Sequence, residues 1–90
     1  MKPIKITKQF KKDVKRLKRQ RKNFNKLKAV IDTLSDEKIL EEKYRDHKLI
    51  GNYLNARECH LEPDWLLIYE ISEKSIKLRR TGSHAELFKL

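Results

Sequence analysis

Residues 54–81 of this 90-residue chain, LNARECHLEPDWLLIYEISEKSIKLRRT, decide its fold class. Three runs within them favour β-strands, at 54–62, 65–71 and 76–81, and short polar turns separate the runs. The middle run, WLLIYEI, is almost continuously apolar, which is typical of a central strand that is covered on both faces. The stretch therefore predicts a three-stranded antiparallel meander.

The part of the chain that precedes the meander predicts one short strand and two helices. Residues 2–7 alternate between polar and apolar side chains, as a strand does. Phe10, Val14 and Leu17 then recur at the spacing of one helix face, and Asn23 is suited to cap a second helix. The apolar residues of that second helix are Phe24, Leu27, Val30, Ile31 and Leu34. We expect the two helices to form a hairpin.

The remaining segments connect and close this arrangement. Residues 35–50 are polar and lack a sustained period, so we expect a long connection with one helical turn. Ser83 can cap a short terminal turn at 84–88. At 10.9 kDa the chain fits a single domain, residues 1–90. The predicted fold class is α+β, in the order β-α-α-β-β-β, with an antiparallel sheet packed against the N-terminal helical hairpin.

Positive charge is concentrated in the first third of the chain. The whole chain carries 23 Lys and Arg residues against 13 Asp and Glu residues, a net charge of +10. Residues 1–34 hold 13 basic and 2 acidic residues, while residues 35–90 hold 10 and 11. A block this dense favours a polyanionic partner, nucleic acid or an acidic protein segment, over a face that is only solvated. The residues of the first helix that we predict to contact RNA are Lys11, Lys12, Lys15 and Arg16.

Other features narrow the class of function. Cys59 is the only cysteine, so a disulfide within the chain is not expected and a reducing compartment suits the protein. No stretch approaches the ~20 apolar residues of a membrane span, and residues 1–10 lack the apolar segment of a secretory signal. Gly51 and Gly82 stand alone, so nucleotide-dependent chemistry on a glycine loop is not expected. We expect a cytoplasmic protein with no membrane partner and no cofactor.

The candidates for a reactive site are three histidines, a carboxylate, an arginine and two aromatic residues. They are His47, His60, His84, Asp64, Arg80, Trp65 and Phe88. The turn that carries Asp64 lies at the end of the sheet where the third strand of the meander finishes, because alternate strand ends of a meander coincide. We therefore expect His60, Asp64, Arg80 and His84 on one rim.

Such a cluster suits phosphodiester transfer within RNA. The 2′-hydroxyl must lose a proton and the leaving 5′-oxygen must gain one, and histidine, with an ordinary pKa of about 6.5, serves either step. Asp64 can act as a base or orient a histidine, Arg80 can hold the phosphate, and Phe88 can stack on a base. A zinc site ranks below this chemistry because no two histidines have the close spacing of a metal motif.

Each candidate also has a simpler explanation when it is taken alone. His47 is then a surface residue of a polar loop, Asp64 an ordinary turn residue, and His60 a hydrogen-bonded strand residue. Trp65 begins the most apolar strand, so we expect it in the core rather than on a nucleotide. Only the combination of the histidines and Asp64 favours catalysis.

Three motifs, RDHKLIG at 45–51, HLEPDWLLIYEI at 60–71 and RTGSHAELF at 80–88, resemble those of the YafQ branch of the RelE/ParE toxin superfamily. The resemblance spans nearly the whole chain. It implies a β-α-α-β-β-β fold, a cognate acidic antitoxin that neutralises the toxin, and cleavage of messenger RNA on the ribosome. The residues to which it assigns function are His47, His60, Asp64, Arg80, His84 and Phe88.

The same resemblance implies cleavage that leaves a 2′,3′-cyclic phosphate and a 5′-hydroxyl without a metal ion. On this basis we assign His84 as the general acid, Asp64 or His60 as the general base, and His47 as a positioning residue. Two other classes of function remain open at this stage. A ParE-like inhibitor of DNA gyrase shares the fold and the basicity but does not need these histidines, and a non-catalytic RNA-binding module needs only the basic and aromatic residues.

Overall fold

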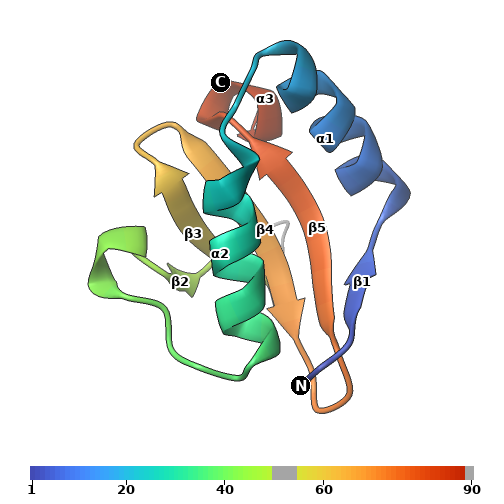
Figure 1. The fold of residues 1–90 in the computed structure, drawn as a ribbon, viewed down its shortest axis with the longest axis vertical. Helices are drawn as coiled ribbons and strands as arrows, with labels where there is room; N and C mark the ends of the chain where they lie inside the picture. Colours follow the sequence, from blue (N-terminus) through green and yellow to red (C-terminus); the bar gives the residue numbers. More distant parts are fainter. Residues whose placement is uncertain (50–54, 89–90) are drawn as a thin grey trace.

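The computed structural model describes residues 1–49 and 55–88, which form a five-stranded sheet with helices on both faces (Figure 1). Along the chain the elements are β1 (Ile4–Ile6), α1 (Lys8–Arg19), α2 (Phe24–Ser35), the 3₁₀ turn η1 (Glu42–Tyr44), β2 (His47–Lys48), β3 (Arg57–Glu62), β4 (Trp65–Ile71), β5 (Ile76–Gly82) and α3 (His84–Phe88). The predicted α+β order is confirmed, with β2 as an additional strand. The predicted end of the long connection at residue 50, the predicted start of the meander at residue 54 and the end of the domain at residues 89–90 lie outside the described residues.

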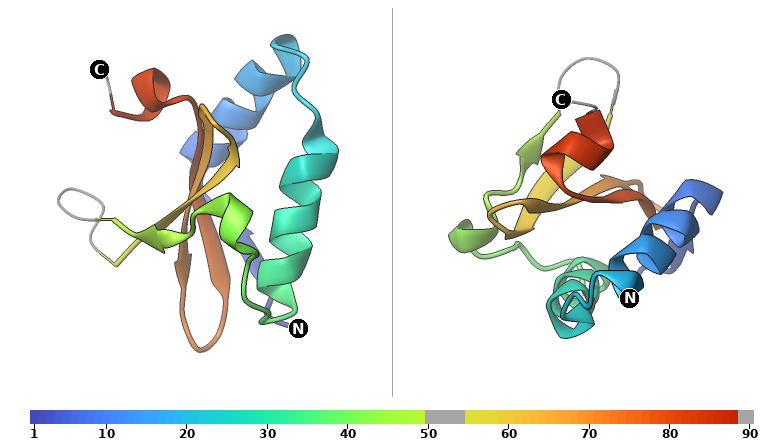
Figure 2. Two further views of the ribbon diagram at one scale, coloured as in Figure 1. Left: turned by 90° about the vertical axis from the view of Figure 1, so that its left-hand side faces the viewer. Right: turned by 90° about the horizontal axis from the view of Figure 1, so that it is seen from above.

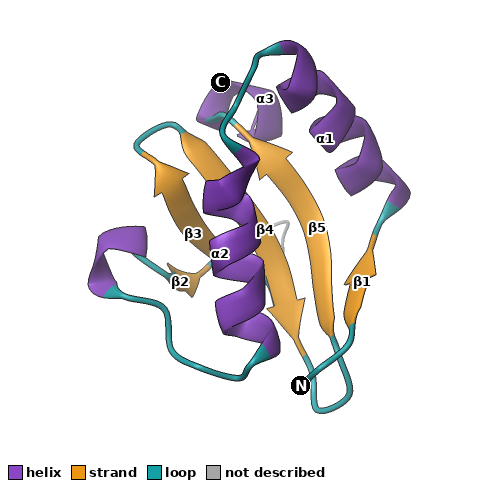
Figure 3. Ribbon diagram, viewed as in Figure 1, coloured by secondary structure: helices purple, strands orange, loops and turns teal. Residues whose placement is uncertain are grey.

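The strands lie in the order β1-β5-β4-β3-β2 (Figure 3). β3, β4 and β5 form the predicted antiparallel meander, in which Leu67 lies between Cys59 and Thr81. The two edges of the sheet differ from the prediction. β1 pairs with β5 in parallel, and His47–Lys48 pairs with β3 as a strand instead of lying in a loop. The sheet is mixed because β1 runs in the same direction as β5 before the chain turns into α1.

Helices α1 and α2 cover one face of the sheet, and α3 lies on the other face (Figure 2). The side chains of β4 alternate between the two faces, as a strand requires. Those that join the core under α1 and α2 are Trp65, Leu67 and Tyr69, and those that pack with Leu87 of α3 are Leu66 and Ile68. This alternation confirms that the apolar run is covered on both sides. Within the described residues, no helix is both long enough and apolar enough to cross a membrane.

Side-chain caps fix where the helices begin. Thr7 Oγ1 accepts a hydrogen bond from the Phe10 N–H at 3.0 Å, and Asn23 Oδ1 accepts one from the Asn25 N–H at 3.0 Å. Ser83 Oγ accepts one from the Glu86 N–H at 3.1 Å, which confirms Ser83 as the cap of α3. These caps satisfy amide groups that have no partner inside the helix. They also set the position of His84, the first residue of α3.

Candidate active site

Three histidines and a phenylalanine form a row across one face of the sheet. The ring centroids of His47 and His60 lie 6.2 Å apart, those of His60 and His84 5.7 Å, and those of His84 and Phe88 6.5 Å. The rings come from β2, β3 and α3, which are distant in sequence. The structure therefore brings together the histidines that the sequence placed on one rim, and it adds His47 to them.

Strand pairing explains why the row lies on the α3 face. His60 is opposite Leu66, and Glu58 is opposite Ile68, and these two apolar side chains pack towards α3. Residues two apart on a strand share a face, so Glu58 and His60 point the same way. His47 is opposite Glu58 and completes the row.

Asp64 holds His84 by two hydrogen bonds. Its Oδ1 accepts one from the His84 N–H at 2.9 Å and lies 2.6 Å from His84 Nδ1. The bond from the backbone N–H, followed by the bond from the imidazole, lowers the pKa of the Asp64 carboxyl. Asp64 is therefore a carboxylate at neutral pH and an acceptor for Nδ1–H. With Nδ1 occupied, the Nε2 atom of His84 is the nitrogen that can meet a substrate.

Glu58 is a member of the site that the sequence analysis missed. It is 6% exposed, and its Oε2 lies 2.8 Å from His47 Nε2, while His47 Nδ1 lies 2.7 Å from the Arg45 carbonyl oxygen. Both neighbours of this ring are acceptors, so the arrangement is fully satisfied when both ring nitrogens carry hydrogen or when Glu58 does. The alternation of β3 was a signal for Glu58, because it places an acidic side chain on the face of His60.

The same residues form the one group of potential metal ligands found among the described residues. One donor atom from each of His47, Glu58 and His60 lies within 4.8 Å of the other two. Imidazole and carboxylate groups suit zinc or copper. A bound ion would be held by these three side chains, so the residues present fit a metal.

Three of the predicted candidates, Trp65, Arg80 and Arg16, lie outside the row of histidines. Trp65 is fully buried and donates from Nε1 to Thr81 Oγ1 at 2.9 Å, which confirms its expected place in the core. Arg80 is engaged with Asp13 of α1, at 2.8 Å from Nε to Oδ2. Arg16 is half-buried and faces Asp13 and Glu86 instead of lying with the exposed lysines of α1, and its role in RNA binding stays a prediction.

The other predicted cations remain on the surface of α1. Lys11, Lys12 and Lys15 are exposed. α1 and α3 lie on opposite faces of the sheet (Figure 2), so these lysines do not line the row of histidines. The structure thus separates a cationic helix face from the candidate reactive groups.

Comparison with known proteins identifies the family of this chain. The family model described as "Bacterial toxin of type II toxin-antitoxin system, YafQ" matches residues 2–89. The chain belongs to the YafQ toxin family. It is 41% identical over 86 residues to the mRNA interferase toxin YafQ of Escherichia coli strain K12, covering 94% of each chain.

Solved structures of similar toxins share the fold. The crystal structure of the E. coli DinJ-YafQ toxin-antitoxin complex contains a chain that is 40% identical, with a TM-score of 0.90 and 97% of each chain covered. A metal-bound toxin from Helicobacter pylori is 43% identical, with a TM-score of 0.91, covering 98% of this chain and 100% of that one. The similarity to the YafQ family that the sequence motifs suggested is therefore confirmed.

Proposed function

We propose that this protein is the toxin of a type II toxin–antitoxin system and an endoribonuclease that cleaves messenger RNA on the ribosome by acid–base catalysis without a metal ion. The observation that carries the proposal is the fixed pair of Asp64 and His84 within the row of histidines. The oriented imidazole has one nitrogen held at 2.6 Å from a carboxylate and the other available to a leaving group. Neither a gyrase inhibitor nor a passive RNA-binding module requires this arrangement.

The reaction follows from the residues of the row. His60 removes the proton from the 2′-hydroxyl, the 2′-oxygen forms a bond to phosphorus, and the bond from phosphorus to the 5′-oxygen breaks. His84 donates a proton to that 5′-oxygen, so the products are a 2′,3′-cyclic phosphate and a 5′-hydroxyl. We assign the base to His60 rather than Asp64, because Asp64 Oδ1 already holds His84 by two contacts.

The remaining residues of the proposed site bind and orient the RNA. Arg80 stabilises the charge on the phosphate, and Phe88, next to His84 in the row, stacks on a base. His47 is a positioning residue, fixed between Glu58 and the Arg45 carbonyl. A metal ion on His47, Glu58 and His60 would polarise a bound oxygen atom. It would also require His47 and His60 to be unprotonated ligands, and His60 would then be unable to accept a proton.

The cationic face of α1 suits ribosomal RNA or the acidic antitoxin. Lys11, Lys12 and Lys15 are exposed on it, and phosphate contacts release counterions, so binding through them weakens as salt rises. The E. coli relative was solved with the antitoxin DinJ. We propose that a cognate acidic antitoxin neutralises this toxin, and that the toxin acts in the cytoplasm, where messenger RNA and ribosomes are found.

Single-turnover cleavage of ribosome-bound messenger RNA tests the proposal. His84→Ala should retain the fold and ribosome binding but lose about 10²–10⁴-fold in rate, the usual contribution of general acid–base catalysis. A substrate with a bridging 5′-sulfur needs no proton on its leaving group and should recover much of that loss. Lys28→Ala is the matched control, because Lys28 pairs with Asp32 on the exposed side of α2.

Several outcomes would contradict the proposal. If His84→Ala and wild type cleave normal RNA equally, or if the mutant is as slow on the sulfur substrate, His84 is not the general acid. If a zinc- and copper-selective chelator at constant Mg²⁺ abolishes wild-type cleavage and added zinc or copper restores it, the reaction depends on a metal. If the wild type leaves RNA intact but inhibits DNA supercoiling by gyrase, the protein belongs with the gyrase inhibitors in function.

A further inference from the structure

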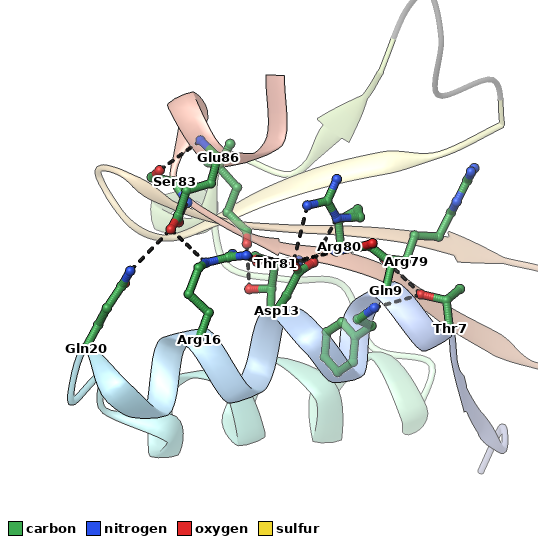
Figure 4. A network of polar contacts seen from close by, with 12 residues as sticks. Thr7, Gln9, Asp13, Arg16, Gln20, Arg79, Arg80, Thr81, Ser83 and Glu86 are labelled. Carbon is green, nitrogen blue, oxygen red and sulfur yellow. Dashed lines mark hydrogen bonds and ion pairs between the residues drawn. The ribbon is translucent and has the colours of Figure 1, made fainter. Parts of the chain in front are cut away.

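A buried carboxylate connects the basic helix to the strand that ends at the site. Asp13 of α1 is 0% exposed although Lys11, Lys12, Lys15 and Arg16 lie within three positions of it in the sequence. Arg80 of β5 donates to it twice, from Nε to Oδ2 at 2.8 Å and from Nη2 to Oδ1 at 3.2 Å. The Thr81 N–H donates to Oδ2 at 3.1 Å. Asp13 therefore fixes both the side chain and the backbone of β5 just before the site (Figure 4).

The second oxygen of this carboxylate extends the network along α1. Arg16 Nη1 donates to Asp13 Oδ1 at 3.0 Å, and Gln9 Nε2 donates to the same oxygen at 3.3 Å. A buried carboxylate is stable only when its lone pairs are satisfied, and here five donors surround it. Hydrophobic packing of α1 would not need such an arrangement, because a leucine or valine would fill the same position.

Arg16 connects Asp13 to α3. Its Nη2 donates to the Thr81 carbonyl at 3.0 Å, and its Nε lies 2.7 Å from Glu86 Oε2. Glu86 Oε1 in turn accepts from the Ser83 N–H at 2.9 Å. Figure 4 shows this chain of contacts running from α1 across the end of β5 to the first turn of α3. The residue that follows Ser83 is His84.

The space at Gly82 belongs to the same network. A Cβ atom at this position would lie 2.6 Å from Arg16 Nη2 and 3.0 Å from Glu86 Oε1. The glycine thus admits the guanidinium of Arg16 between β5 and α3. Four successive residues before His84, from Arg80 to Ser83, contact the network or make room for it, and Asp13 is at its centre.

We propose that Asp13 is a positioning residue for RNA cleavage, which holds Arg80 directly and holds the start of α3, with His84, through Arg16 and Glu86. This inference rests on the proposed function. Asp13 does not touch the substrate, because it is fully buried. It acts through two sets of contacts. One holds Arg80, which contacts the phosphate, and the other holds α3, which carries the general acid His84.

A set of variants tests the proposal by single-turnover cleavage at a temperature where circular dichroism shows every variant folded. Asp13→Asn keeps the shape of the side chain but removes its charge. We expect a loss of about 10²-fold in cleavage rate, since small displacements of reacting groups have effects of this size. Ribosome binding should change less than about twofold, because the lysines of α1 remain exposed. Val30→Ala in α2 is the control, because it weakens the core from a fully buried position away from the network.

Three readouts separate positioning from general stability. In an Arg80→Ala background, Asp13→Asn should lower the cleavage rate much less than it does in the wild type, because the contact between Asp13 and Arg80 is already absent. NMR shifts of the His84 ring should move in Asp13→Asn and stay in place in Val30→Ala. Glu86→Gln, which removes the charge that faces Arg16 Nε, should also lower the rate and move the His84 shifts, and it serves if Asp13→Asn does not fold.

The proposal is overturned if Asp13→Asn cleaves as fast as wild type, or if Val30→Ala loses as much rate. Full additivity with Arg80→Ala, together with unmoved His84 shifts, would also overturn it. Failure of the proposed function is distinguishable from these results. If wild type cleaves no RNA, the proposed function is wrong, and the His84 shifts in Asp13→Asn and Glu86→Gln still decide whether Asp13 positions α3.

Discussion

Two clusters of a carboxylate and an arginine hold elements that carry residues of the row of histidines, and they are built differently. On the His84 side Asp13 has a fully buried side chain, paired with Arg80. On the His47 side Asp46 has a side chain that is 22% exposed, and it accepts from Arg57 Nε at 3.2 Å and Nη2 at 2.9 Å. The hydroxyl of Tyr69 donates to the same carboxylate. The buried carboxylate needs a protein donor for every lone pair, whereas water can reach the partly exposed one.

The two clusters hold different kinds of element. Asp13 lies in the middle of α1 and binds β5 near its end, at Arg80 and Thr81, and it is fully buried, so it belongs to the packed body of the protein. Asp46 immediately precedes β2 and fixes the chain next to His47. Burial, followed by the bond to Asp46, raises the pKa of Tyr69, so its hydroxyl remains protonated as a donor. We expect loss of the first cluster to affect the whole fold and loss of the second to act locally.

The largest expected effect is on stability and follows from removal of the buried carboxylate. Asp13→Ala leaves Arg80 and Arg16 without their central acceptor, and breaking a buried ion pair in this way typically costs about 3–5 kcal/mol. Asp46→Ala should have a clearly smaller effect, because water can replace the carboxylate. Urea denaturation followed by far-UV circular dichroism measures both. Equal losses for the two variants would show that burial does not distinguish the clusters.

The next largest effect is on the free energy of unfolding at acid pH. Burial acts to raise the pKa of Asp13, but the hydrogen bonds that it accepts, with Arg80 first, outweigh burial and leave the pKa below its ordinary value of 3.8. The charged form of Asp13 therefore stabilises the fold above about pH 4, and this contribution disappears as the pH falls through the lowered pKa. Asp13→Asn should be less stable than wild type at pH 6, and the gap should narrow towards pH 2. Urea titrations at each pH measure the free energy of unfolding of both proteins. A difference between them that stays constant from pH 6 to pH 2 would show that the charge of Asp13 is not its source.

Tyr69→Phe tests the cluster around Asp46. It removes the hydroxyl that donates to Asp46 and leaves the buried ring in the core. We expect a loss of about 1–2 kcal/mol, typical of a hydrogen bond to a charged group. The RNA cleavage rate of Tyr69→Phe should fall only to the extent that loss of this hydrogen bond displaces His47. If Tyr69→Phe destabilises the protein as much as Asp13→Ala, the second cluster is also part of the packed body.

The smallest effect concerns the thiol of Cys59. Burial, followed by the charges of Asp46 and Glu58, raises its pKa to about 12. Cys59 should therefore react very slowly with a disulfide reagent in the native protein at pH 8 and rapidly in urea. Asp46→Asn should increase the native reaction rate modestly, by removing a nearby negative charge and loosening β2. Asp13→Asn should not do so at a temperature where it is folded.

Much of this structure was accessible from the sequence because local signals agreed with one another. The apolar run of β4, the caps at Asn23 and Ser83, and the spacing of Phe10, Val14 and Leu17 each specified a short-range feature. The meander then placed His60 and His84 at the same end of the sheet, since strand ends are fixed by connectivity. This is why the row of histidines could be predicted in outline.

Other features depend on contacts between distant segments, and residue patterns do not reveal them. β2 is only two residues long, so its pairing with β3 leaves no periodicity to detect. Arg16 sits among lysines in the sequence, and only the position of Glu86 and Gly82 turns it inward. Asp13 interrupts the cationic stretch of α1, which was a signal, but its partner Arg80 is 67 positions away.

The shortness of β2 has a consequence for hydrogen exchange. The strand is joined to β3 through two residue pairs, His47 with Glu58 and Lys48 with Arg57, whereas β4 and β5 share six. Elements with few backbone bonds open at low free energy while the rest of the protein stays folded. Amide protons of β2 should thus exchange long before those of β4. His47 can leave the row and return in a local opening, while His60 lies on β3, which pairs with β4 through five residue pairs.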